Sequence, residues 1–536
     1  HSPQVLSSSP SCSAMKPISL SSWWSQNDDV LHTLLFVTFS VVVFSFWVLF
    51  IKKYKTTTST PPLPPGPLGL PLVGNLLSLR PQLHSYFLGL AQAHGPIFRL
   101  RLGTKTCIVV SSPSSARHIL KDHDVTFANR DVPEAARAAT YGGSDIAWIQ
   151  YYGPEWRMLR KVCTLKMLSN TTLDSVYGLR RRQIRKTVGY LYARVGSPIN
   201  VGQQAFLTAF NVVTNMLWGG TGEGDERAGL GVGAEFREVV SGLVELIGKP
   251  NVSDFYPGLA PFDLQGIRKR VERLVRRLDG IFEEMIDRRL RIDKDGGKES
   301  KDFLAFLLSL KDEVDSKTPL TINHVKALLM DMVVAGTETS SNTVEFAMAE
   351  VMNKPEVMQK AQQELDAVVG KHNIVEESHI HKLPYLQAIM KETLRLHPVV
   401  PLLIPHSPTE TCTVGGYTIP KGSRVFVNVW AIHRDPCNWE NPLEFDPNRF
   451  LDSKWDYSGK DFTYLPFGSG KRICVGIALA ERMVMHLLAM LLHSFDWRLP
   501  QGEELDLSEK FGVAMKKEVP LVAIPTPRLS DPALYE

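Results

Sequence analysis

The chain has 536 residues, of which 44% are hydrophobic, 9% aromatic and 22% charged. This ordinary globular composition excludes an intrinsically disordered, collagen-like or disulfide-stapled chain. With 60 Lys and Arg against 56 Asp and Glu the net charge is +4, which gives no reason to expect a nucleic acid as partner.

The first predicted element is a membrane anchor at residues 30–51, a run without Asp, Glu, Lys or Arg. As a helix this run would reach about 33 Å, enough for a bilayer core of about 30 Å. A cleaved signal peptide is the alternative, but its apolar region is shorter and ends at small residues. Two aspartates precede the run, and three lysines follow it, Lys52, Lys53 and Lys55. This asymmetry predicts a single-pass helix with the rest of the chain in the cytosol.

The segments beside the anchor carry less information. Residues 1–29 are small and polar and predict a disordered extension, with Met15 as the suspected true start. Residues 60–71 (TPPLPPGPLGLP) predict a stiff hinge, because proline fixes φ and favours extended backbone. One large domain is expected over 72–528, followed by a short tail at 529–536.

The large domain is predicted to be mainly α with a small β portion. Residues 97–111 alternate and then run apolar around a Gly-Thr turn, and residues 412–428 carry two glycine turns, as strand hairpins do. Apolar residues recur with the period of a helix in eight segments: 154–168, 200–218, 232–247, 263–292, 321–353, 355–369, 384–396 and 475–494.

One cysteine near the C-terminus stands in an unusual context. The six cysteines form no C-x-x-C pair, which excludes zinc ribbons and thioredoxin motifs. Cys474 ends a glycine-rich stretch, FGSGKRICVG at 467–476, where a helix is expected to begin. Unpaired N–H groups and the helix dipole favour a thiolate there, and a thiolate can ligate a metal. The alternative is a small buried apolar side chain, the commoner role of a free cysteine.

The pattern F-x-x-G-x-R-x-C-x-G resembles the haem-binding loop of the cytochrome P450 haem-thiolate monooxygenases. The resemblance implies the fold of that family and haem b as cofactor. It implies that Cys474 is the fifth ligand of the iron. It also assigns Phe467, Arg472 and Gly476 to the cofactor-binding loop.

Further matches extend the resemblance along roughly residues 60–528. The stretch WRMLRK at 156–161 is similar to the family's W-R-x-x-R-K helix, which implies that Trp156 and Arg160 bind the haem propionates. His406 is implied as another propionate contact. Glu392, Arg395 and Arg449 match a buried charged triad with a structural role; a surface ion pair is the usual reading of the first two alone.

The helix expected at 321–353 contains AGTETS at 335–340. The Thr339 hydroxyl can bond the carbonyl four residues back and open the helical hydrogen-bond ladder. Without the cysteine loop, a routine helical threonine and a solvated acid would be the default. The resemblance instead implies that Thr339 and Glu338 are catalytic and move protons during oxygen activation.

The implied reaction inserts one oxygen atom of O₂ into a C–H or C=C bond and releases the other as water. No flavin or nicotinamide motif is present, so the resemblance implies electrons from NADPH through an NADPH–cytochrome reductase of the endoplasmic reticulum membrane. Arg157, Lys161, Lys471 and the basic run 180–186 are expected to form its docking face. A solvated charge run is the alternative for 180–186.

The segments that the resemblance places over the haem are almost all hydrocarbon, which predicts a lipophilic substrate. FANR at 127–130 and ERM at 481–483 resemble the plant microsomal branch that oxidises terpenoids and flavonoids. Terpenoid hydroxylation is favoured; flavonoid or phenylpropanoid hydroxylation, a hydroperoxide-rearranging haem-thiolate enzyme and a non-catalytic haem-binding membrane protein are the alternatives. The expected pocket residues are Ala335, Val399, Leu403, Phe511 and Val513.

Overall fold

The computed structural model describes residues 32–45, 47–48, 61–219, 226–294, 302–311, 318–451 and 455–536. The chain divides into two units, residues 1–60 and 61–536. In the first unit His32–Ser45 form a short apolar helix with mostly exposed side chains. The extension expected at 1–29 and parts of the anchor expected at 30–51 lie outside the described residues.

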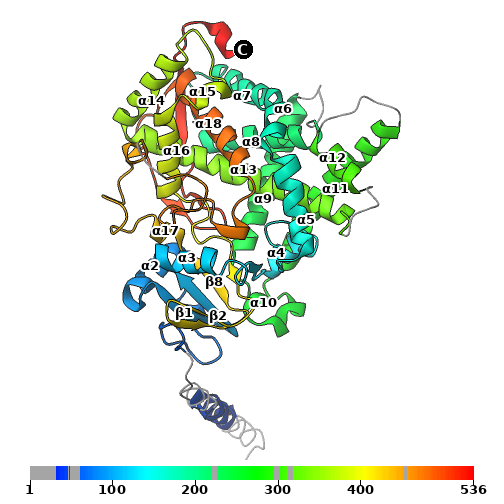
Figure 1. Ribbon diagram of the computed structural model, residues 1–536, viewed down its shortest axis with the longest axis vertical. Helices are drawn as coiled ribbons and strands as arrows, with labels where there is room; N and C mark the ends of the chain where they lie inside the picture. Colours follow the sequence, from blue (N-terminus) through cyan, green and yellow to red (C-terminus); the bar gives the residue numbers. More distant parts are fainter. Residues whose placement is uncertain are drawn as a thin grey trace, which may run out of the picture. The chain divides into compact units, whose positions relative to one another are not determined.

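The second unit is built around one long central helix, α13 (Ile322–Asn353) (Figure 1). The Thr321 hydroxyl accepts a hydrogen bond from the N–H of His324, and the His324 side chain accepts one from Thr321, so a capping box starts the helix. Buried residues lie on all sides of α13, as expected for a core helix. It packs against α8 (Val201–Trp218), α16 (Pro384–Leu396) and α18 (Ile477–Ser494).

The other helices surround this core, and six of the eight predicted segments meet helices within a few residues of their bounds. The second unit is therefore mainly helical, as predicted. The longer surrounding helices are α2 (Leu83–His94), α5 (Pro154–Val162), α7 (Tyr177–Tyr192), α9 (Glu226–Gly248), α11 (Ile267–Lys294), α12 (Phe303–Lys311) and α14 (Pro355–Val368). The shorter ones are α3 (Pro113–Arg117), α4 (Glu134–Ala139), α6 (Asn170–Ser175), α10 (Val252–Phe255), α15 (Glu377–Ile380) and α17 (Val429–Ile432).

The main sheet has the strand order β1-β2-β8-β5-β3. The hairpin predicted at 97–111 is confirmed, because Ile97 of β1 pairs with Val110 of β2 in antiparallel register. The pairing predicted within 412–428 is confirmed by β6 and β7. The strands are β1 (Ile97–Leu102), β2 (Lys105–Val110), β3 (Asn129–Arg130), β5 (His406–Ser407), β6 (Cys412–Val414), β7 (Tyr417–Ile419) and β8 (Arg424–Val427). Smaller sheets contain β4 (Ile199–Asn200), β9 (Phe495–Arg498), β10 (Glu509–Lys510), β11 (Lys516–Lys517) and β12 (Val522–Pro527).

The N-terminal and C-terminal segments of the second unit are hydrogen-bonded to the rest of that unit. The N–H of Arg99 donates to the Pro65 carbonyl at 2.7 Å, so the proline-rich segment pairs with the edge of β1 over part of the expected hinge. At the other end Tyr535 is 1% exposed, and its hydroxyl donates to the Ser494 carbonyl at 2.8 Å. The segment expected as a tail, 529–536, is thus packed against the body.

Among the described residues, α18 is the one helix long and apolar enough to cross a membrane, and it is largely buried inside the body. Its position against α13 makes it a core helix of the second unit. The helix at His32–Ser45 is apolar but shorter than a bilayer span.

Candidate functional site

The loop that carries Cys474 is held in one shape by its glycines. Gly470 has φ +71°, and a Cβ atom added there would lie 2.2 Å from the Leu120 carbonyl oxygen. The N–H of Cys474 donates to the Phe467 carbonyl at 3.0 Å, which closes the loop. The N–H of Gly476 donates to the Cys474 sulfur at 3.3 Å. This last bond favours a negatively charged sulfur.

Burial raises the pKa of the Cys474 thiol, although the Gly476 N–H and the Arg160 charge lower it. Burial thus opposes the thiolate that the sequence predicts, and α18 begins only at Ile477. Cys474 nevertheless has accessible surface. A bound metal ion would supply the charge that stabilises the thiolate.

Buried positive groups gather near this loop. Burial and the charge of Arg472 hold the pKa of Arg130 well below its usual range. Burial lowers the pKa of Arg472 to about 10, and burial and Arg130 hold the pKa of His406 well below its ordinary value. In the part of the chain that the structure describes, the carboxylate of Asp145 raises the pKa of both Arg130 and Arg472. A cluster of this kind fits a further anion, and haem brings two propionate carboxylates.

The predicted propionate donors contact backbone carbonyls. The Trp156 indole donates to the Ile146 carbonyl at 3.1 Å, and the Arg160 guanidinium donates to the Ile473 carbonyl at 2.5 Å. The two side chains thus donate to two different backbone carbonyls, and their binding of the propionates stays a prediction. The His406 ring donates from Nδ1 to the Phe127 carbonyl at 2.7 Å, since a carbonyl oxygen can only accept.

Arg130 was not identified from the sequence as a site residue. It pairs in register with His406, Arg130 of β3 opposite His406 of β5. Its guanidinium donates to the Ile404 carbonyl at 2.6 Å and to the Ala147 carbonyl at 3.3 Å. The local sequence carries no signal for this role, because the contacts come from strand pairing across the domain.

The hydrogen bond predicted for Thr339 is present, and α13 is a continuous α-helix through this position. The Thr339 hydroxyl donates a short hydrogen bond to the Ala335 carbonyl, and Ala335 is exposed in the middle of this otherwise buried helix. Glu338 is 6% exposed, and burial raises the pKa of its carboxyl. Ser241 of α9 hydrogen-bonds to Glu338, and the Lys516 ammonium donates to the Ser241 hydroxyl at 3.2 Å. Ser241 thus links Glu338 to Lys516, which is partly exposed.

Glu392, Arg395 and Arg449 lie together. Arg395 forms two hydrogen bonds with Glu392, at 2.7 Å and 2.8 Å, and both residues are 0% exposed. The Arg449 Nε lies 3.1 Å from Glu392 Oε1. Arg395 also donates to the His433 carbonyl at 2.8 Å. The triad joins α16 to the segment before the cysteine loop.

An apolar cavity of about 110 Å³ lies between α2, the 400–405 turn and the 511–513 turn. Leu403, Phe511 and Val513 line it, together with Trp148. The described residues that line it do not include the other two expected pocket residues, Ala335 and Val399. A Cβ atom added to Gly468 would lie 3.6 Å from Leu403 Cδ1, so Leu403 connects the cavity wall to the cysteine loop.

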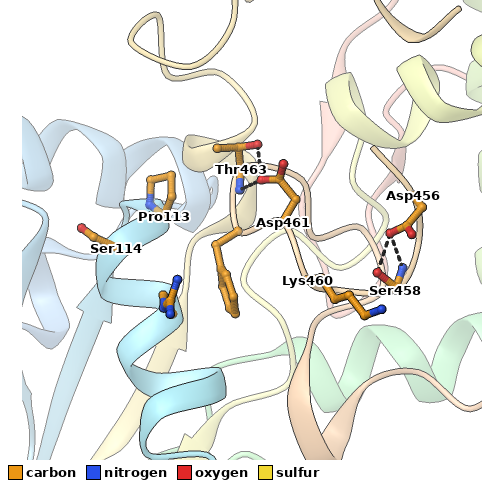
Figure 2. A pocket seen from close by; sticks show the side chains of 9 residues that line it. Pro113, Ser114, Asp456, Ser458, Lys460, Asp461 and Thr463 are labelled. Atoms are coloured by element: carbon orange, nitrogen blue, oxygen red, sulfur yellow. Dashed lines mark hydrogen bonds between the residues drawn. The ribbon is translucent and has the colours of Figure 1, made fainter. Parts of the chain in front are cut away.

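A second, larger hollow of about 480 Å³ is polar and open to solvent (Figure 2). It lies between α3 and the loop 456–463. Asp456 accepts from the N–H and hydroxyl of Ser458, and Asp461 does the same for Thr463. Both carboxylates are therefore used in local turns. The described lining contains none of the predicted site residues, so this hollow is not the candidate site.

The basic run at 180–186 is mostly structural. Arg180 is 0% exposed and forms two hydrogen bonds of 2.7 Å with Glu377, and Arg181 pairs with Glu376 at 2.8 Å. The expected docking role of this run is wrong for Arg180, because its charge is buried in an ion pair. Arg157, Lys161 and Lys471 are exposed.

The comparisons with known proteins agree with the geometry. The family profile described as Cytochrome P450 matches residues 64–523. A flavonoid 3'-monooxygenase of Crocosmia x crocosmiiflora is 40% identical over 512 residues, covering 94% of this chain and 99% of the relative. A geraniol 8-hydroxylase of Swertia mussotii is 40% identical, covering 93% and 99%. A carnosic acid synthase of Salvia fruticosa is 39% identical, covering 92% and 99%.

A solved structure has the same fold. The zebra fish cytochrome P450 with abiraterone superposes with a TM-score of 0.71 and 26% sequence identity. The match covers 84% of this chain and 100% of that chain.

Proposed function

The chain belongs to the cytochrome P450 family of haem-thiolate monooxygenases, and from this premise we propose that it hydroxylates a lipophilic terpenoid of plant specialised metabolism. The observation that carries the substrate proposal is the lining of the cavity beside the cysteine loop. Leu403, Phe511 and Val513 contribute hydrocarbon surface there, which selects a ligand by shape and apolar area. The relative named geraniol 8-hydroxylase acts on a terpenoid alcohol, which supports this choice.

Haem b, when bound, supplies the reduction of O₂ and the transfer of one oxygen atom to carbon, with electrons from NADPH through a partner reductase. In the proposed arrangement Cys474 holds the iron, and the Gly476 N–H stabilises the charge on its sulfur. Arg130, Arg472 and Trp156 hold the propionate carboxylates. Trp156 and Arg472 both donate to the Ile146 carbonyl, at 3.1 Å and 3.3 Å, and Arg130 donates to the next carbonyl, Ala147, at 3.3 Å.

Two residues of α13 are proposed to handle protons. The Thr339 hydroxyl bonds the carbonyl of Ala335, an exposed residue of the helix, and could hold a water molecule there. Glu338 keeps a raised pKa because it is buried. Its carboxyl therefore keeps its proton to a higher pH than an exposed glutamate does.

A flavonoid or phenylpropanoid substrate is the second candidate. It is favoured by the 40% identity to a flavonoid 3'-monooxygenase over nearly the whole chain. Flat aromatic substrates would also fit an apolar cavity that contains Phe511 and Trp148.

We also propose an endoplasmic reticulum membrane location, with residues 30–51 as a single-pass anchor and the catalytic domain in the cytosol. The charge asymmetry around residues 30–51 supports this location. Arg157, Lys161 and Lys471 are proposed as the docking face for an acidic NADPH–cytochrome reductase, since all three are exposed.

The substrate proposal is tested by titrating the haem-loaded chain with terpenoids and flavonoids and recording the shift of its absorption spectrum. We expect saturable binding of a terpenoid, and an oxygenated product when reductase and NADPH are added. Phe511→Ala should raise the spectral Kd about tenfold, a loss of about 1.4 kcal/mol. Lys421→Ala, at an exposed turn away from the cavity, is the control. Binding of flavonoids alone would replace the terpenoid proposal by the second candidate.

A further inference from the structure

The carboxylate of Glu509 joins the strand β10 to segments that are distant in the sequence. Glu509 lies two residues before Phe511, which lines the apolar cavity. Its Oε1 accepts a hydrogen bond from the Arg434 guanidinium at 3.2 Å, and its Oε2 accepts one from the Trp430 indole at 2.9 Å. The backbone carbonyl of Glu509 accepts another from the Gln82 side chain at 2.8 Å. Both the main chain and the side chain of Glu509 are therefore held.

A buried histidine links the same carboxylate to the central helix α13. The His397 ring bridges two carboxylates, with Nδ1 2.6 Å from Glu509 Oε1 and Nε2 2.8 Å from Glu350 Oε1. His397 is 5% exposed, and Glu350 of α13 is 3% exposed. Hydrogen bonds to an ionised carboxylate are among the stronger ones in proteins, and several of them fix its orientation. Glu509 is thus held rigidly against the core.

A second histidine connects Glu509 to the cavity wall. His84 of α2 contacts both Trp430 and Phe511, with ring centroids 4.7 Å and 5.4 Å apart. His84 Nε2 lies 3.6 Å from Glu509 Oε2. His84 is 3% exposed, so close packing leaves its ring little room to move. The Phe511 ring therefore packs against a side chain that the Glu509 carboxylate holds.

The turn that carries Phe511 is also held at its other end. The N–H of Met515 donates to the Val399 carbonyl at 2.7 Å, and the Asn342 amide of α13 donates to the Met515 carbonyl at 3.0 Å. The cavity-lining residues 511–513 lie between these bonds and Glu509. Releasing the Glu509 carboxylate would therefore free one end of the turn and leave the other end in place.

We propose that Glu509 is a positioning residue for substrate recognition, whose carboxylate holds His84 and the turn 511–513 and so fixes the Phe511 ring in the cavity wall. The proposal rests on the proposed function, because it takes this cavity as the place of the substrate. The described residues that line the cavity do not include Glu509, so it acts through Phe511. In a cavity of about 110 Å³, the position of one aromatic ring decides which ligand shapes fit.

The test is a double-mutant cycle on the spectral Kd of the full, haem-loaded chain for geraniol, the terpenoid alcohol used as probe. Glu509→Gln should raise the Kd about fivefold and Phe511→Ala about tenfold. The double variant should stay at about tenfold, because the effect of Glu509 passes through the Phe511 ring. Glu518→Gln, which changes an exposed carboxylate just after β11, is the control and should follow wild type. A double variant at about fiftyfold, the product of two independent effects, would overturn the proposal.

A second measurement needs no substrate and separates this proposal from the proposed function. Hydrogen–deuterium exchange of the haem-loaded chain should be faster in Glu509→Gln than in wild type for the amides of 509–517, and unchanged for the hairpin 97–110.

Trp430→Phe removes one donor to Glu509 and keeps a ring beside His84. It should speed exchange of the same amides by a smaller factor, and it decides the point if Glu509→Gln does not fold. Exchange over 509–517 that is no faster than in Glu518→Gln would overturn the proposal. Faster exchange in a chain that does not bind geraniol would support the positioning role of Glu509 and contradict the terpenoid proposal alone.

Discussion

Arg160 of α5 donates a hydrogen bond of 2.5 Å to the carbonyl oxygen of Ile473, the residue that precedes Cys474. The bond ties the cysteine loop to a helix more than 300 residues away in the sequence. Burial lowers the pKa of Arg160, and Cys474 opposes that effect. The guanidinium therefore both fixes the backbone of the loop and places a positive charge near the proposed thiolate.

Arg160→Ala should accelerate haem loss about 10- to 100-fold, because a residue that orients a metal-ligand loop is removed. Arg160→Lys should recover only part of this loss, since an ammonium lacks the planar donor fork. The measurement is haem dissociation from the purified protein. Arg157→Ala, an exposed residue on the same helix, is the control. Equal haem loss in both alanine variants would contradict the assigned role of Arg160.

Glu392→Gln should destabilise the fold by about 3–5 kcal/mol, because it leaves the buried charges of Arg395 and Arg449 without their carboxylate. Equilibrium unfolding in urea measures the loss. Glu272→Gln breaks an exposed Arg268–Glu272 pair of 2.9 Å and should cost at most about 0.5 kcal/mol. Similar losses for the two variants would show that the triad does not order the core.

Thr339→Ala should lower the yield of product per NADPH and raise the release of hydrogen peroxide, because it removes the hydroxyl proposed to take part in proton transfer. NADPH consumption, product and peroxide are measured in the same reaction. Thr337→Ala is the matched control. Thr337 is 0% exposed and donates to the Val333 carbonyl at 2.6 Å, an equivalent bond on the same helix. Unchanged coupling in Thr339→Ala would remove Thr339 from the proposed relay.

A buried histidine makes stability depend on pH. His397 lies 2.8 Å from Glu350 and 2.6 Å from Glu509. Burial lowers the pKa of His397, but the bonds to the two carboxylates outweigh it and raise the pKa above its ordinary value. The imidazolium therefore stabilises the fold fully below about pH 6.5, its unfolded pKa. This contribution is lost as pH rises through the raised folded value.

The wild-type Tm should accordingly fall as pH rises above neutral. His397→Gln, which has no charge to lose, should lack that part of the decline. His381→Gln, at an exposed position, should retain it. Thermal unfolding across a pH series decides the point, and parallel Tm profiles for wild type and His397→Gln would refute it.

Local patterns predicted most of the secondary structure. The hairpin at 97–111 and the helix at 321–353 follow from alternation and periodicity, and both are present within a residue or two. Helix α7 was not predicted, because its arginine run resembles a solvated surface. In fact Arg180 is buried against Glu377, a partner 197 residues away.

The chemistry of the site was less accessible from the sequence. The motif around Cys474 identified the ligand candidate, but not the burial that raises its thiol pKa. Arg130 has no local signature, because strand pairing brings it into place beside His406. Such roles depend on contacts between segments that are distant in the sequence, and local sequence patterns do not predict these contacts.

The most direct test of the central claim is the carbon monoxide difference spectrum of the reduced, haem-loaded chain. We predict the red-shifted Soret band of thiolate ligation in wild type and in Cys437→Ser, which changes an exposed cysteine. Cys474→Ser should lose that band. A band that persists in Cys474→Ser, or a wild-type spectrum without the red shift, would contradict the assignment of Cys474 as the iron ligand.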